Sequence, residues 1–223
     1  MFSYYGSKSK IVQYYPLPIY NTIIEPFAGS ARYSLRYYWN KVELNDKYDV
    51  IYKIWKYLIN DATKDSINNL PEMKHGDRLP DWLGESEKYL MGLQIGSGGY
   101  EPRNMCSPWA EEKNEITKLK KKMLKLCPRI KHWKIENKDY KDIANKEVTW
   151  FIDPPYQVGG SYYKENKIDY NELRDWCMSR KGQVIVCENS KADWMDFKPL
   201  KKMYGQQFTT TEVMWTNINI ELF

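Results

Sequence analysis

A short apolar run that ends in a rigid polar turn constrains the fold of this chain more than any other feature. Val148-Thr149-Trp150-Phe151-Ile152 is almost continuously apolar, a pattern typical of a central strand buried on both faces of a sheet. The run leads directly into Asp153-Pro154-Pro155-Tyr156, where two successive prolines fix φ and remove two backbone donors. The strand therefore ends in a rigid loop that holds a carboxylate at its carboxyl end.

Strand and helix signals alternate on both sides of this run, which predicts an α/β fold. Short β-branched segments predict the strands, and apolar residues at helical spacing predict the helices. The expected strands span 22–25, 42–44, 133–135, 148–152, 183–187 and 209–215, and the expected helices span 31–38, 50–58 and 170–178. We expect the last strand, 209–215, to lie at an edge of the sheet.

The alternation lapses between residues 60 and 128, which we interpret as a small, mainly helical insertion into a domain formed by 1–59 and 129–223. Glycines predict a mobile loop over 94–100. A helix should follow, with apolar residues on one face and lysines on the other. The stretch from Lys113 to Lys134 contains nine basic residues and a single acid, Glu115.

Composition excludes several kinds of site. The four cysteines form no C-x-x-C pair and there are only two histidines, so we expect neither a metal centre nor a Ser/His/Asp triad. No apolar stretch approaches the roughly 20 residues of a membrane span, so we expect a soluble, cytoplasmic protein that does not enter a membrane. The formal charge of +5 permits a polyanionic partner without requiring one.

Two further features fall at the carboxyl ends of predicted strands, where open α/β sheets bind ligands. Glu25-Pro26-Phe27-Ala28-Gly29-Ser30-Ala31 follows the first strand, and its small residues allow close backbone approach to a ligand ahead of a helix N-terminus. An acid after the second strand could hold the hydroxyls of a nucleoside ribose. Asp46 lies at the strand's end and is favoured for this role, but Glu43 remains an alternative.

The residues of Asp153-Pro154-Pro155-Tyr156 suit the methylation of a planar amino group. An exposed Asp153 carboxylate and the Pro154 carbonyl would accept the two hydrogens of the NH2 group, and so orient the nitrogen lone pair toward an electrophile. Tyr156 can stack on a base that has left a duplex. Such stacking returns about 1–3 kcal/mol, close to the few kcal/mol that flipping a base costs.

With these motifs in this order, the chain resembles the Dam-like, D12-class family of DNA adenine N6-methyltransferases. The resemblance implies a Rossmann-like class I methyltransferase sheet, mixed and of about seven strands, that binds S-adenosylmethionine. It assigns catalysis to Asp153, Pro154, Pro155 and Tyr156. It assigns cofactor contacts to Tyr5, Gly6 and Lys8 of the opening motif, to Glu25, Pro26, Phe27, Ala28, Gly29, Ser30 and Ala31, and to Asp46, Asp139, Tyr140 and Asp153.

Two details of the resemblance bear on the site. Ala31 stands where a second glycine is common in the family, which crowds the cofactor loop. Glu212-Val213-Met214-Trp215-Thr216-Asn217 is similar to a recurrent family ending, for which we expect a structural role.

The motif order is similar to the α arrangement of amino-methyltransferases, which implies that residues 60–128 recognise the target in double-stranded DNA. From charge alone, we expect the 96–103 loop and the lysine-rich helix to contact phosphates. The predicted DNA-binding residues are Arg103, Lys118, Lys121, Lys122 and Lys125. Two alternatives stay open: an RNA amino-methyltransferase, and a catalytically silent nucleic-acid-binding protein of the same fold.

Overall fold

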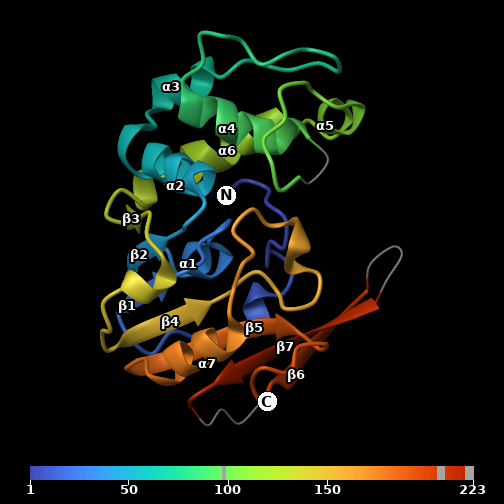
Figure 1. The fold of residues 1–223 in the computed structure, drawn as a ribbon. Helices are drawn as coiled ribbons and strands as arrows, with labels where there is room; N and C mark the ends of the chain where they lie inside the picture. The colour runs from blue at the N-terminus through green and yellow to red at the C-terminus, as the bar shows by residue number, and fades with distance from the viewer. Residues whose placement is uncertain (97–98, 205–208, 219–223) are drawn as a thin grey trace.

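The structure, a computed structural model, describes residues 1–96, 99–204 and 209–218. Within them, seven strands form one sheet in the order β3-β2-β1-β4-β5-β7-β6 (Figure 1). The strands are β1 (Thr22–Glu25), β2 (Lys41–Asn45), β3 (Lys134–Glu136), β4 (Val148–Ile152), β5 (Gly182–Asn189), β6 (Lys198–Tyr204) and β7 (Thr209–Thr216). The first five run parallel to one another, and β7 pairs antiparallel with both β5 and β6. This mixed sheet confirms the predicted Rossmann-like α/β fold.

The strand order reverses between β1 and β4. The chain proceeds from β1 to β2 and β3 on one side, then returns to place β4 on the other side of β1. Ile24 of β1 pairs with Trp150 of β4, and all five residues of β4 are buried, as the sequence predicts for a central strand. The loops that follow β1 and β4 therefore emerge side by side, at the place where an open α/β sheet binds its ligand.

The prediction of 209–215 as an edge strand is wrong. β7 lies between β5 and β6, pairing Glu188 with Val213 on one side and Lys202 with Thr211 on the other. The edge is β6, which the sequence did not reveal because Pro199 and the flanking lysines weaken the apolar pattern of a strand. Proline and lysine are common on edge strands, where they discourage pairing with another chain.

Helices cover both faces of the sheet. They are α1 (Arg32–Arg36), α2 (Asp49–Lys56), α3 (Lys64–Asn69), α4 (Glu85–Ile95), α5 (Pro108–Glu112), α6 (Glu115–Leu126) and α7 (Tyr170–Met178). Short 3-10 turns lie at Val12–Tyr14, Cys127–Arg129, Tyr140–Asp142 and Gly160–Tyr162, and a π-helical turn, Tyr57–Asp61, continues α2. Figure 1 shows α2 to α6 grouped at one end of the molecule, with α7 at the other. Among the described helices, none is both long and apolar enough to cross a membrane.

The expected loop over 94–100 begins later than predicted. Gln94 and Ile95 are buried residues of α4, and residues 97–98 lie outside the described part of the chain. The segment after them returns to α4, where the Arg103 amide donates to the Gly92 carbonyl at 3.0 Å. A Cβ at Gly92 would lie 2.8 Å from the Arg103 carbonyl oxygen, so this close return requires glycine.

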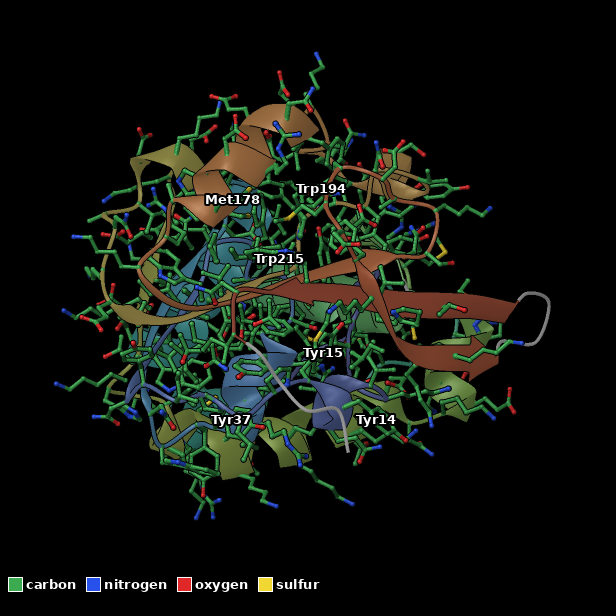
Figure 2. The ribbon with its side chains drawn as sticks, turned by 90° about the horizontal axis from the view of Figure 1, so that it is seen from below. Tyr14, Tyr15, Tyr37, Met178, Trp194 and Trp215 are labelled. Carbon is green, nitrogen blue, oxygen red and sulfur yellow. The ribbon has the colours of Figure 1, made fainter. Side chains whose placement is uncertain are left out.

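Apolar side chains form a core on each face of the sheet. One core holds Trp150 and Trp176, and the other holds Tyr33 and Phe151 together with Leu90 and Leu119 from the 60–128 segment. Figure 2 shows Trp194 and Met178 on one side of the sheet and Tyr15 and Tyr37 on the other. The 60–128 segment thus shares a core with the α/β domain, and its role as a separate recognition unit stays a prediction.

Candidate functional site

A cavity of about 330 Å³ opens at the carboxyl ends of β1, β2 and β4. Its volume lies within the range of small-molecule sites. Segments far apart in the sequence line it: residues 4–8, 25–32, 46–48, 138–140, 151, 153, 155, 163–165, 167 and 168. These include every predicted cofactor residue, namely Tyr5, Gly6, Lys8, Glu25, Pro26, Phe27, Ala28, Gly29, Ser30, Ala31, Asp46, Asp139, Tyr140 and Asp153.

Glu25 and two left-handed residues shape the loop after β1. The buried Glu25 carboxyl accepts a hydrogen bond from the Ser34 amide at 2.7 Å and so ties β1 to the start of α1. Burial raises the pKa of Glu25 to about 8, against the opposing effect of the bonds from Ser34. Gly29 and Ala31 both have a φ of 44°. Ala31 therefore adopts a conformation that favours glycine, which is consistent with a glycine being common here in the family.

Of the two acids considered for the ribose, only Asp46 lines the cavity. Its carboxylate accepts hydrogen bonds from the Gly29 amide at 2.9 Å and the Tyr48 amide at 3.0 Å, and burial raises its pKa to about 6. Glu43 instead pairs with Lys146 at 2.6 Å, outside the cavity. The two acids differ in position along the strand. Glu43 lies within β2, where its side chain is directed to one face of the sheet, whereas Asp46 lies just past the carboxyl end.

Aromatic rings and an acid form the wall beyond Asp46. The rings of Phe27 and Tyr140 lie 5.4 Å apart between centroids, and the buried Tyr140 hydroxyl has no partner within the described residues. Asp139 accepts from Lys47 at 3.1 Å. Burial opposes ionisation of Asp139, but the Lys141 amide and Lys47 together lower its pKa. This wall combines an apolar aromatic surface with hydrogen-bonding groups.

Asp153 is paired with Lys8 and is less exposed than the sequence led us to expect. Its side chain is 22% exposed, and the Lys8 ammonium lies 2.7 Å from Oδ1. Burial raises the pKa of Asp153 to about 6; Lys8 lowers it and Glu212 raises it. The pKa of Lys8 is raised, because Asp153 and Glu212 outweigh the effect of its burial. Both groups are therefore charged at neutral pH.

Asp153, Pro154, Pro155 and Tyr156 form the predicted catalytic quartet, and hydrogen bonds hold its later residues in place. Tyr170 donates to the Pro155 carbonyl at 2.8 Å. No residue that the structure describes donates to the Pro154 carbonyl, but Pro154 is buried, and neither Pro154 nor Tyr156 is among the residues that line the cavity. Tyr156 donates to Glu212 at 2.5 Å, and the Lys8 ammonium lies 4.6 Å from the centre of its ring. A stacked base would have to use the ring face that Lys8 leaves open.

Two buried acids that we did not predict as site residues support the quartet. Glu188, at the end of β5, accepts from the Gln157 amide at 2.6 Å and from the Trp194 indole at 3.2 Å. Glu212, for which we expected only a structural role, accepts from Tyr156 and lies 3.7 Å from Lys8. An acid within an otherwise apolar strand was the available signal, because a buried carboxylate needs partners.

The predicted DNA-binding residues lie in two places. The loop that carries Arg103 reaches the mouth of the cavity, where Glu101 pairs with Lys164 and the rings of Tyr100 and Tyr5 lie 6.4 Å apart. The predicted lysines of α6 are exposed, whereas Lys120 of the same helix is partly buried. Lys118 is paired with Glu115 at 3.0 Å. Lys121, Lys122 and Lys125 make no ion pair with the described residues. No residue of the 60–128 segment lines the cavity as described.

Comparison with known proteins bears on the first part of this site. Residues 4–91 match the model of the D12 class N6 adenine-specific DNA methyltransferase family. The match confirms the predicted resemblance over this span and supports a methyltransferase. It covers the opening motif, the loop after β1 and Asp46, whereas Asp153-Pro154-Pro155-Tyr156 lies outside it and is brought to these residues by the fold.

Beyond the D12-class match, the similarities are remote. No curated protein sequence matches the chain. A structure described as "conserved hypothetical protein" from Streptococcus pyogenes is 8% identical, with 88% of this chain and 86% of that chain covered and a TM-score of 0.38. Another, "Putative methyltransferase yhhF from Escherichia coli", is 12% identical, with 86% and 74% covered and a TM-score of 0.29. The fold assignment rests on the strand order, not on these alignments.

Proposed function

We propose that this protein transfers a methyl group from S-adenosylmethionine to N6 of an adenine flipped out of double-stranded DNA in the cytoplasm. One observation carries the proposal: Asp153 opens into the same cavity as the opening motif and the loop after β1. Those two segments lie within the D12-class match. An acceptor for an amino group and the expected cofactor residues therefore share one site.

The cavity residues fit S-adenosylmethionine. Asp46 can accept from the ribose hydroxyls, and the aromatic wall of Phe27 and Tyr140 can contact the purine ring. The methionine end would lie toward residues 5–8. The Lys8 ammonium lines the same cavity and is bonded to Asp153, and its expected contact with the cofactor stays a prediction. Arg32, which donates to Ser7 at 2.9 Å and lines the same cavity, is the other cation at that end.

Asp153 and Pro154 would orient the target amino group. When bound, S-adenosylmethionine supplies an electrophilic methyl group on a positively charged sulfur. The Asp153 carboxylate accepts one amino hydrogen and the unbonded Pro154 carbonyl accepts the other, which directs the nitrogen lone pair out of the ring plane. Asp153 can then accept the proton that the nitrogen loses, because its pKa of about 6 lies near neutrality.

The 60–128 segment would recognise the DNA through its 99–103 loop. Ion pairing of Glu101 with Lys164 fixes this loop at the cavity mouth, beside the expected position of the flipped base. The exposed lysines of α6 would add phosphate contacts farther away. Such contacts strengthen binding to any sequence and weaken as salt rises.

Product analysis tests the proposed function. The protein is incubated with radiolabelled S-adenosylmethionine and with PCR-amplified DNA, with RNA, or with neither, and the digested nucleosides are then separated. We expect label in N6-methyl-2′-deoxyadenosine, from DNA alone. Label only in RNA would support the RNA amino-methyltransferase, and no label in any reaction would support a silent binding protein; either result contradicts the proposal.

Isosteric variants of the two competing acids test the cofactor site. We expect Asp46→Asn to raise the Kd for S-adenosylmethionine about tenfold, since a hydrogen bond to a charged group contributes about 1.5–3 kcal/mol. Glu43→Gln is the matched control and should leave the Kd within about twofold, because its partner is Lys146. Isothermal titration calorimetry measures both. Weakened binding in Glu43→Gln alone would reverse the assignment.

A further inference from the structure

Glu212 is a buried acid at the catalytic centre, beyond the residues of the quartet. It lies in β7, next to β5, and its side chain is 10% exposed. Three groups approach its Oε1 atom: the Tyr15 hydroxyl at 2.6 Å, the Tyr156 hydroxyl at 2.5 Å and the Lys8 ammonium at 3.7 Å. Figure 2 shows Tyr15 beside the sheet, on the side away from Met178.

Lys8 lies between two carboxylates and is bonded to one of them. Its ammonium is 2.7 Å from Asp153 Oδ1 and 3.7 Å from Glu212 Oε1. The Asp153 carboxylate would accept the target amino hydrogen at the oxygen that Lys8 does not bind, so the ammonium and the amino group would share its negative charge. Binding of the base therefore weakens the contact between Lys8 and Asp153, because a second donor draws on the same charge.

A displaced ammonium needs a new partner. Lys8 is 6% exposed, so it cannot reach water without a larger rearrangement. Leaving a buried charge unpaired is strongly destabilising. Glu212 is positioned to avoid this cost: a shift of about 1 Å would bring the ammonium into hydrogen-bond range of its carboxylate. No described residue donates to Glu212 Oε2, so the carboxylate retains acceptor capacity.

We infer that Glu212 is a positioning residue that receives the Lys8 ammonium when the target amino group binds Asp153. The same carboxylate holds the Tyr156 hydroxyl, so one side chain sets both the destination of Lys8 and the placement of the Tyr156 ring. This inference rests on the proposed function. It explains how Asp153 can bind the base while the Lys8 ammonium keeps a negatively charged partner.

Glu212→Gln separates the charge from the hydrogen bonds. Glutamine keeps an acceptor oxygen for Tyr15 and Tyr156 but removes the negative charge, so Lys8 has only Asp153 as an anionic partner. We expect the KM for PCR-amplified DNA to rise about tenfold, as the loss of about 1.4 kcal/mol implies. The Kd for S-adenosylmethionine should stay within about twofold. Tyr15→Phe is the matched control: it removes one bond and no charge, and should leave the KM for DNA near the wild-type value.

Glu212→Asp keeps the charge on a shorter side chain, so its KM for DNA should fall between those of the wild type and Glu212→Gln. A wild-type KM in Glu212→Gln, or a KM in Glu212→Asp above that of Glu212→Gln, would overturn the inference, because charge would not be the cause. If the wild-type protein itself methylates no DNA in this assay, the proposed function fails and the inference fails with it. Wild-type activity with an unchanged Glu212→Gln variant overturns the role of Glu212 alone.

Discussion

Asp153→Ala is expected to abolish methyl transfer and to leave cofactor binding largely intact. The Asp153 carboxylate lies in the cavity and is bonded to Lys8, and no other acid is in hydrogen-bond contact with that ammonium among the described residues. Removing one preorganised hydrogen-bonding group from an active site typically costs about 10²–10³ in rate. We expect a loss of at least this size, measured as label transferred to PCR-amplified DNA.

The control for Asp153→Ala is Asp142→Ala, at an exposed aspartate outside the cavity, which should keep full activity. Calorimetry with S-adenosylmethionine supplies the second readout. We expect the Kd for the cofactor to stay within a few-fold in Asp153→Ala. An equal loss of transfer and of cofactor binding would contradict a role in orienting the amino group. It would indicate instead that the substitution has damaged the whole cavity.

Lys8→Met is expected to shift the pH dependence of methyl transfer upward. Lys8 lowers the pKa of Asp153, which is about 6 with the ion pair in place. Without the ammonium, Asp153 faces Glu212 in a buried site, so its pKa rises. Transfer needs the carboxylate form and is therefore lost as pH falls through the Asp153 pKa. A rise of about two units would reduce the ionised fraction about tenfold at pH 7.

The measurement for Lys8→Met is the initial rate at saturating cofactor from pH 5 to 9. The acid limb should move from about 6 to above neutrality, with partial recovery of the rate at high pH. Lys10→Met removes an exposed lysine two residues away and should keep the wild-type profile. A uniform loss of rate with an unmoved acid limb would show that Lys8 does not control the ionisation of Asp153.

Local sequence predicted most of the sheet. Strands 22–25 and 148–152 match β1 and β4 residue for residue, because buried parallel strands are made of continuous apolar runs. β6 was missed because its lysines and proline fit an edge strand but not the apolar pattern used to find strands. As a result β7 was placed at the edge. Its true place depends on pairing with β5 and β6, which no local pattern records.

Local sequence also predicted part of the candidate site. The motifs around Gly29 and Asp153 follow strands, so the rule that ligands bind at carboxyl ends located them. The rule left Asp46 and Glu43 unresolved, and the structure distinguishes them through the Gly29 amide and Lys146. Lys8 lines the cavity as expected, but local sequence did not indicate that its ammonium is bonded to Asp153, which is distant in the chain.

The sequence by itself determined the candidate catalytic loop and the strand that this loop follows. A rigid Asp153-Pro154-Pro155-Tyr156 loop follows from backbone sterics alone, and so does its position after a buried strand. Only the tertiary structure decided which charges face one another. The placement of Lys8 between Asp153 and Glu212 joins three distant segments. Coulombic and hydrogen-bonding interactions depend on distance in space, and the fold sets that distance.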